Sequence, residues 1–283
     1  MRVLPFFFPP CPFPPRLSAA LLRATALEFA ILAGHLVLYP SGIAQERRHD
    51  VGALPSPAPV EPGATRLPAT GPDHPPVVLL HGFADNRSVF VLLRRSLTRH
   101  GWHHLEPLNY SLLTCDIRTA AELLGRHVEE ICDRTGHPRV DIVGHSLGGL
   151  IARYYVQRLG GDARVRTLVT LGTPHAGTGV APPMSAHPLV RQMRPGSDVI
   201  EELREPAPAC RTRFVSFWSD LDQVMVPVDA ACVSHPDLIA RNVRVTGIGH
   251  LALPVHPAVA AGIRQALEEQ DTGAGASGTA SVA

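Results

Sequence analysis

Short apolar runs alternate with helix-length segments along the middle of the chain. The runs are almost continuously hydrophobic, as in parallel strands that are buried on both faces. Between them, apolar residues recur every three or four positions, which predicts amphipathic helices. The alternation predicts an α/β fold, in which helices cover both faces of a mostly parallel central sheet. Strands are predicted at residues 77–80, 140–143, 165–171, 214–218 and 243–246, and helices at 89–99, 117–134, 147–159 and 257–269.

The two ends of the chain lack this alternation. Residues 1–16 are rich in proline and phenylalanine and predict a disordered leader, because proline does not support a helix. Residues 46–76 predict a proline-rich linker, and residues 271–283, which are small and polar, predict a disordered tail. A length of 283 residues therefore favours one folded domain at 77–270 with extensions at both ends.

An apolar helix is predicted at residues 17–45, and its apolar part, 17–39, is long enough to cross a bilayer. Arg23 and Glu28 interrupt this stretch, so an amphipathic helix on the domain or on a membrane surface is an alternative. A signal peptide cleaved before Gln45 is another. We expect residues 17–39 to tether the protein to a membrane, or the protein to be secreted, with its folded domain outside the cytoplasm.

Charge and composition exclude several kinds of function. The formal net charge is +1, so no broad basic field favours nucleic acid as a partner. Every basic side chain is arginine, and the absence of lysine excludes Schiff-base chemistry and a phosphate-loop lysine. No Cys/His grouping has the spacing of a zinc site. We therefore expect no metal and no cofactor, and we expect a monomer.

The cysteines suggest one disulfide. Cys115 and Cys132 flank a predicted helix and would lie about 25 Å apart at 1.5 Å per residue, which is too far for a bond. Cys210 and Cys232 remain a plausible pair that would close the loop between them. A bond there is expected to stabilise the protein by roughly 3 kcal/mol.

The strongest chemical signal is the sequence VDIVGHSLGGLIARYY at residues 140–155. Strand residues run into a Gly-x-Ser-x-Gly turn centred on Ser146, and an apolar-periodic helix follows. This context is that of a nucleophile elbow, in which glycines two positions before and after the serine permit the tight turn. The start of the helix directs the amide of Leu147 towards a developing oxyanion.

From these motifs the chain resembles the α/β-hydrolase superfamily, and more narrowly secreted lipases and esterases of actinobacteria and Bacillus. The resemblance covers most of residues 76–267 and rests on VVLLHGF, GHSLGGL, LVTLGTPHAGT, FWSDLDQVMVP and VTGIGHLALP in that order. It implies that His81 is structural, that Gly82 permits a turn, and that Phe83 donates the second oxyanion-hole amide. It also implies a lid or acyl-pocket wall at residues 180–193, for which an ordinary exposed connection is the alternative.

A serine needs a histidine to take its proton, and that histidine needs a carboxylate. In this fold the acid and then the histidine follow the serine along the chain. His250 matches the family's histidine, whereas His256 is better explained as a residue at a helix start. Asp220 and Asp222 lie too close together for physical reasoning to separate them, and the family pattern selects Asp222.

Three further histidines, His100, His103 and His104, are expected to be structural or exposed, and His145 is expected to be a packed residue that points away from the nucleophile. The sequence thus predicts a carboxylic ester hydrolase, a lipase or esterase that acts on acylglycerols or other acyl esters through Ser146, Asp222 and His250. Acyl transfer by the same residues and a non-catalytic binding protein of this fold are the alternatives.

Overall fold

A computed structural model describes residues 22–31, 74–83, 87–108, 116–181, 187–269 and 279–282. The predicted leader at 1–16 and nearly all of the predicted linker at 46–76 lie outside these residues, as do Cys11 and Cys115. Within the described part of the chain, no helix is both long and apolar enough to span a bilayer.

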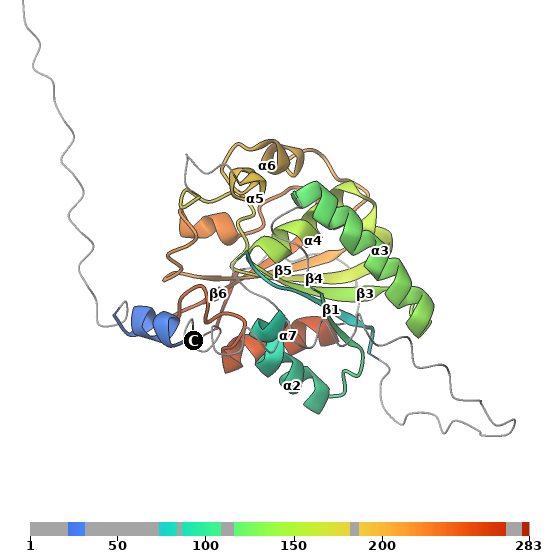
Figure 1. The fold of residues 1–283 in the computed structure, drawn as a ribbon, viewed down its shortest axis with the longest axis horizontal. Helices are drawn as coiled ribbons and strands as arrows, with labels where there is room; N and C mark the ends of the chain where they lie inside the picture. The colour runs from blue at the N-terminus through green and yellow to red at the C-terminus, as the bar shows by residue number, and fades with distance from the viewer. Residues whose placement is uncertain are drawn as a thin grey trace, which may run out of the picture.

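The centre of the molecule is a seven-stranded sheet in the order β2-β1-β3-β4-β5-β6-β7, and all six strand pairings are parallel (Figure 1). Because β1 pairs with β2 on one side and with β3 on the other, the order reverses between β1 and β3. Ligands bind parallel sheets at such a reversal, beyond the carboxyl ends of the strands. The strands are β1 (Val77–Leu80), β2 (Leu105–Leu108), β3 (Val140–His145), β4 (Val165–Leu171), β5 (Arg213–Ser219), β6 (Ile239–Val245) and β7 (Thr279–Val282).

Helices cover the sheet on both faces (Figure 1). Helices α3 and α4 lie on one face and α2 and α7 on the other, and the short α5 and α6 lie beyond α4. The helices are α2 (Val91–Arg99), α3 (Ile117–Thr135), α4 (Leu147–Arg158), α5 (Pro188–Gln192), α6 (Asp198–Glu202) and α7 (Pro257–Glu268), and the 3-10 turns are η1 (Arg87–Phe90), η2 (Gly161–Ala163) and η3 (Val228–Ala231).

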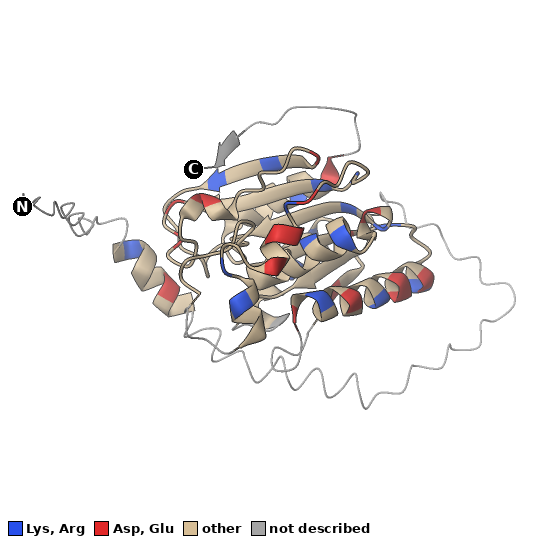
Figure 2. Ribbon diagram, turned by 90° about the horizontal axis from the view of Figure 1, so that it is seen from above, with Lys and Arg blue, Asp and Glu red and all other residues tan. Residues whose placement is uncertain are grey.

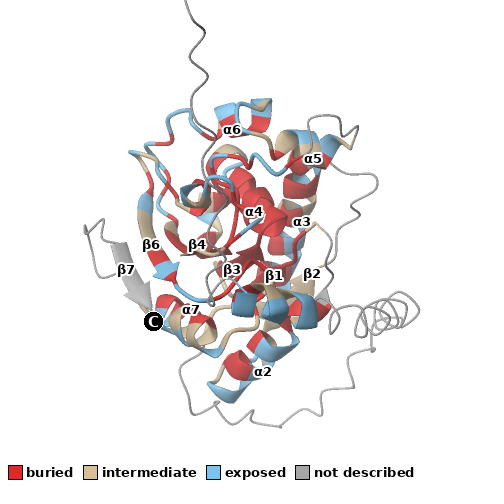
Figure 3. Ribbon diagram, turned by 90° about the vertical axis from the view of Figure 1, so that its left-hand side faces the viewer, coloured by how far each residue is buried: buried red, intermediate tan, exposed pale blue. Residues whose placement is uncertain are grey.

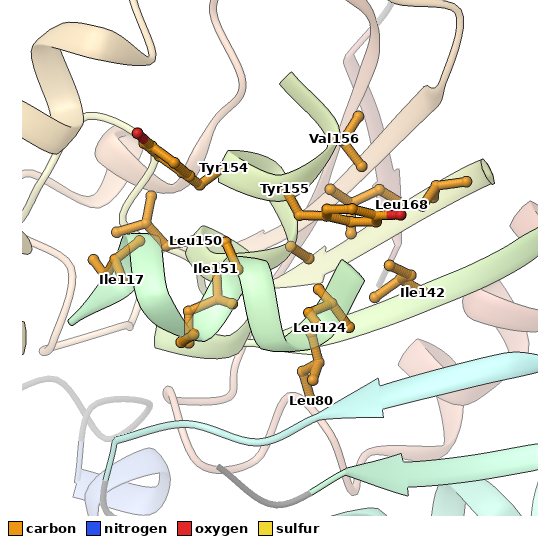
Figure 4. Packing of buried hydrophobic residues seen from close by; sticks show 14 of the residues in the cluster. Leu80, Ile117, Leu124, Ile142, Leu150, Ile151, Tyr154, Tyr155, Val156 and Leu168 are labelled. Carbon is orange, nitrogen blue, oxygen red and sulfur yellow. The ribbon is translucent and has the colours of Figure 1, made fainter. Parts of the chain in front are cut away.

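Alternate residues of the strands feed two separate apolar layers, because successive side chains of a strand point to opposite faces. Leu80 and Ile142 pack against α3 and α4, together with Leu124 and Ile151 (Figure 4). Leu79 and Val143 join the layer beneath α2 and α7. Helix α4 is buried along almost its whole length (Figure 3). In contrast, α3 carries many charged residues (Figure 2), and those from 122 to 134 are exposed. Helix α4 is therefore packed into the core on one face of the sheet, and it begins at the carboxyl end of β3.

Two strands of the structure differ from the sequence predictions, whereas a helix within residues 17–45 was predicted. The apolar pattern did not predict β2, where Glu106 and Pro107 interrupt the run on a half-buried edge strand. Residues 279–282 form β7 beside β6, although the sequence predicts an irregular tail there. Residues 22–31 are helical and lie against the domain, at the blue end of the chain in Figure 1. We call residues 22–31 the N-terminal helical segment.

The expected disulfide between Cys210 and Cys232 is wrong, since both cysteines are free. Cys210 precedes the first residue of β5. Cys232 follows Ala231, whose carbonyl accepts a hydrogen bond from Ser216, three residues inside that strand. Arg213 and Ser216 are three residues apart, so β5 advances roughly 10 Å between them at about 3.3 Å per strand residue. The two cysteines bracket the loop in sequence but lie at different heights on the sheet.

Candidate active site

Ser146 lies at the turn between β3 and α4 with φ 52° and ψ −120°. Among the described residues it is the only one other than glycine with a positive φ. A left-handed conformation at such a residue costs about 1–3 kcal/mol and persists where the surrounding structure holds it. Here the amide of Ser146 donates to the carbonyl of Leu171 at 2.8 Å, and Thr173 Oγ1 donates to the carbonyl of Ser146 at 3.0 Å.

The glycines on either side of Ser146 allow β3 and α4 to approach each other and β1. A Cβ atom at Gly144 would lie 2.5 Å from the Cα of Gly149. A Cβ atom at Gly148 would lie 2.5 Å from the carbonyl oxygen of His81 and closer still to that of Leu80. No side chain fits at either position, so the Gly-x-Ser-x-Gly spacing follows from the close contact of three backbone segments.

Asp222 and His250 come together from the loops after β5 and β6. Nδ1–H of His250 donates to Oδ2 of Asp222 at 2.7 Å, and both side chains are buried. Oδ1 of Asp222 accepts the amides of Val224 and Met225 at 2.9 and 3.0 Å. Three donors therefore fix the carboxylate, and because Nδ1 is bonded to Asp222, Nε2 is the ring nitrogen that can exchange a proton with a neighbour.

Asp220, the alternative acid, points elsewhere. Its Oδ2 accepts Nη2–H of Arg244 at 2.8 Å, and the Arg244 guanidinium also lies over the Trp218 ring, 5.7 Å from its centre. Asp220 thus belongs to a partly exposed ion pair beside the loop. The structure brings Asp222, and not Asp220, to His250.

The other histidines that the sequence singled out have separate environments. His256 stands at the N-cap of α7 without a side-chain cap bond, and Nδ1 of His81 donates to the carbonyl of Gly82 at 2.9 Å. His100 donates to the carbonyl of Ser96 at 2.7 Å. His145 lies closer to the site than expected: its ring centre is 4.8 Å from that of His250, and its Nε2–H donates to the His250 carbonyl at 3.3 Å. His145 therefore supports the main chain of His250.

A cavity of about 410 Å³ opens over these groups. Phe83, three residues after the end of β1, lines the cavity with its ring edge-on to His187, and Leu147 begins α4. Part of the predicted wall at residues 180–193 lies in α5 and the residues next to it. Residues 182–186 lie outside the residues that the structure describes. The lining is mostly apolar and includes Ser146, His250, Phe83, Val180, Val190, Met193 and Met225.

A buried arginine holds one wall of this cavity in place. Arg153 of α4 donates through Nη1 to the carbonyl of His175 at 3.1 Å and through Nη2 to that of Leu203 at 3.0 Å. Burial lowers the pKa of Arg153 to about 10. The two bonds tie the loop after β4 to the end of α6, so the wall rests on the rigid helix α4.

A helix packed on the domain was one alternative for residues 17–39, but its contact with the His250 loop was not predicted. Glu28 accepts the amides of Leu251 and Ala252, the two residues after His250, at 2.9 and 3.0 Å. An acidic residue inside an apolar stretch was the only available signal, and it marks a polar contact without identifying the partner. Within the described residues, no cluster of three or more His, Cys, Asp or Glu side chains is arranged to hold a metal.

Comparison with known proteins gives a family and a fold. The sequence model of the palmitoyl protein thioesterase family matches residues 76–230. Triacylglycerol lipases of Pseudarthrobacter phenanthrenivorans and Burkholderia plantarii are each 31% identical to the chain over 111 residues. That match covers 36% of this chain and 34% and 30% of the two relatives, so the chain aligns with about a third of their length.

Solved structures with the same fold are more distant in sequence. Lipase B of Aspergillus fumigatus aligns with a TM-score of 0.61 at 16% identity, covering 69% of this chain and 53% of that one. A lipase of Bacillus licheniformis in its mature form aligns with a TM-score of 0.58 at 16% identity, covering 70% and 93%. At this identity the likeness establishes the α/β-hydrolase fold.

Proposed function

The chain belongs to the palmitoyl protein thioesterase family, and we propose that it is a serine hydrolase that cleaves carboxylic esters through an acyl-enzyme on Ser146. The observation that carries the proposal is the convergence of a strained Ser146 with the buried Asp222–His250 pair at one cavity. Strain at a non-glycine residue is retained at functional sites, and this one places Ser146, which lines the cavity, at the start of a buried helix.

In the proposed mechanism, Nε2 of His250 takes the hydroxyl proton as Ser146 attacks the ester carbonyl. Asp222 holds the tautomer with its proton on Nδ1 and stabilises the imidazolium that forms. His250 then gives the proton to the leaving alcohol, which leaves the acyl group on Ser146. Water, activated by the same histidine, hydrolyses the acyl-enzyme and restores the serine.

The tetrahedral intermediate carries a negative oxygen, and backbone amides are the groups proposed to stabilise it. Leu147, the first residue of α4, offers an amide at a helix N-terminus, where the helix dipole favours negative charge. Phe83 offers a second amide from the loop after β1. Removal of one such donor costs about 2.7–4 kcal/mol of transition-state stabilisation in other enzymes, so two aligned amides account for a large share of catalysis.

For the substrate, we propose esters with an apolar acyl group, because Val180, Val190 and Met193 line the cavity beside Ser146. Acylglycerols are one candidate class, supported by the triacylglycerol lipases that resemble part of the chain. Fatty acyl thioesters are a second class, supported by the family match at residues 76–230. Both classes pass through the same acyl-enzyme and differ only in the leaving group.

For location, we propose that residues 17–39 attach the enzyme to a membrane outside the cytoplasm. Because residues 22–31 lie on the domain, the attachment takes the form of a helix along the membrane surface. Leu22 and Phe29 support this form, since they are 55% and 68% exposed on the helix. Replacing both by serine in the full chain should move the enzyme from the membrane fraction to the soluble one. An unchanged distribution, or a wild type that is already soluble, would refute the attachment.

The test of the catalytic proposal is Ser146→Ala against Ser234→Ala, a matched change at an exposed serine. Loss of the nucleophile should lower kcat by about 10⁴ to 10⁶ on every oxyester and thioester that the wild type cleaves. The control should keep wild-type activity. Near wild-type turnover in the Ser146 variant, with its far-UV circular dichroism unchanged, would overturn the proposal.

A further inference from the structure

The N-terminal helical segment contacts the loop that carries His250. Both oxygens of Glu28 are used: Oε2 accepts the amide of Leu251 at 2.9 Å, and Oε1 accepts the amide of Ala252 at 3.0 Å. These two amides follow His250 directly in the chain. Glu28 lies 223 residues before Leu251 in sequence, so the contact depends on the tertiary structure alone.

The loop is shaped to receive this carboxylate. A Cβ atom at Gly249 would lie 2.6 Å from the Cδ of Glu28, so a side chain at 249 would push Glu28 away. The segment is also held on both sides of Glu28: Ala24 is buried, and Ile31 packs against the apolar layer beneath the sheet. The close approach at Gly249 and the packing of the segment on both sides of Glu28 therefore place the carboxylate at one point of the His250 loop.

The main chain of His250 is thereby fixed from two directions. On one side Nε2–H of His145 donates to the His250 carbonyl at 3.3 Å. On the other side Glu28 accepts hydrogen bonds from the next two amides, those of Leu251 and Ala252. The imidazole must keep its bond to Asp222 and its place beside Ser146 at the cavity, because small displacements of a general base reduce the rate strongly.

We propose that Glu28 is a positioning residue for His250, so that the N-terminal helical segment is part of the hydrolase site. The inference rests on the proposed function. It also constrains how residues 17–45 are arranged. Cleavage before Gln45, or insertion of residues 17–39 across a bilayer, would remove Glu28 from the loop. The active enzyme therefore keeps this segment on its domain.

The test compares Glu28→Ala and Glu28→Gln with Thr25→Val in the full-length protein. Glutamine keeps the shape of the side chain and one acceptor, whereas alanine removes both acceptors. Thr25 accepts a hydrogen bond from Gln223 at 3.2 Å in the same interface, so its valine variant removes one exposed interface bond while Glu28 keeps its bonds to Leu251 and Ala252. The measurements are kcat and KM on a soluble p-nitrophenyl ester, and hydrogen exchange of the peptide spanning residues 249–256.

We expect the alanine variant to lose about 10- to 100-fold in kcat, the glutamine variant to lose less, and KM to stay within about twofold in both. Exchange at residues 249–256 should rise in the same order. Thr25→Val should match the wild type in kcat and in exchange at this loop. A merely structural contact would lower thermal stability without this selective loss of kcat. Should the alanine variant not fold, the isosteric glutamine variant decides.

Unchanged kcat in both Glu28 variants would overturn the positioning role, and so would an equal loss in Thr25→Val. Failure of the proposed function is a different result, namely a wild type that cleaves no ester. In that case hydrogen exchange alone decides: faster exchange at residues 249–256 in Glu28→Gln supports the fixing of the loop, and unchanged exchange refutes it.

Discussion

Replacement of Asp222 by asparagine changes the site in a way that the geometry defines closely. Oδ1 of Asp222 accepts two backbone amides at 2.9 and 3.0 Å, and Oδ2 accepts Nδ1–H of His250 at 2.7 Å. Asparagine has only one oxygen. If that oxygen stays with the two amides, its NH2 group faces Nδ1, and the imidazole must carry its proton on Nε2. That tautomer cannot take the proton of Ser146.

The opposite orientation of the amide is costly. It would turn the NH2 group towards the amides of Val224 and Met225 and leave two buried donors without an acceptor. At about 1–3 kcal/mol for each, the cost is roughly 2–6 kcal/mol, or about 1.5 to 4 powers of ten in population. The neutral oxygen also stabilises the imidazolium less than a carboxylate does. We therefore expect kcat to fall by a factor on the order of 10⁴.

The assay is steady-state hydrolysis of a soluble p-nitrophenyl ester by the two asparagine variants, at Asp222 and at Asp220. The matched change at Asp220 removes only its partly exposed pair with Arg244, and it should alter kcat by no more than about threefold. The role of Asp222 as the acid is refuted if the Asp222 variant keeps more than about a tenth of the wild-type kcat. A greater loss in the Asp220 variant would refute it as well.

Three further outcomes concern stability and reactivity. Arg166→Met leaves the buried Asp141 without its partner and should lower the free energy of unfolding by about 3–5 kcal/mol in urea denaturation at pH 7. Because burial raises the pKa of Asp141, the protonated form is tolerated, so the deficit should be smaller at about pH 5 than at pH 8. Gly148→Ala should destabilise the protein by about 1–3 kcal/mol and lower kcat/KM, measured by thermal unfolding and ester hydrolysis, because its Cβ meets the backbone after β1. Burial raises the pKa of Cys232 to about 11, so iodoacetamide at pH 8 should alkylate it about 100-fold more slowly in the native than in the unfolded protein, as followed by mass spectrometry. Equal rates in the two states, or no reactive thiol after unfolding, would contradict this expectation.

The strands that the sequence predicted best are those buried on both faces. Val77–Leu80 and Val165–Leu171 have the predicted bounds because their apolar runs begin and end with the strand. β2 is half-buried at the side of the sheet and contains Glu106 and Pro107, so its pattern resembles a loop. The short helices α5 and α6 have five residues each, too few for a helical period to be visible.

The candidate site divides in the same way. Ser146 and His250 each follow an apolar strand and lie in a glycine-containing turn, so the local sequence was enough to predict their positions. Asp220 and Asp222 share one loop, and only the direction of their side chains separates them. The contact of Glu28 with Leu251 joins the two ends of the chain, and a single sequence contains no pattern that records such a distant pairing.

The most direct test of the account is the reaction of the folded protein with a fluorophosphonate probe, which attacks activated serines, followed by mass spectrometry of the labelled peptides. We expect a single adduct, on Ser146, in the wild type and no adduct in Ser146→Ala. We also expect adduct formation to slow in Asp222→Asn, because the attacking serine depends on His250. An adduct on another residue, or a wild-type protein that stays unlabelled while it hydrolyses esters, would contradict the assignment of Ser146 as the nucleophile.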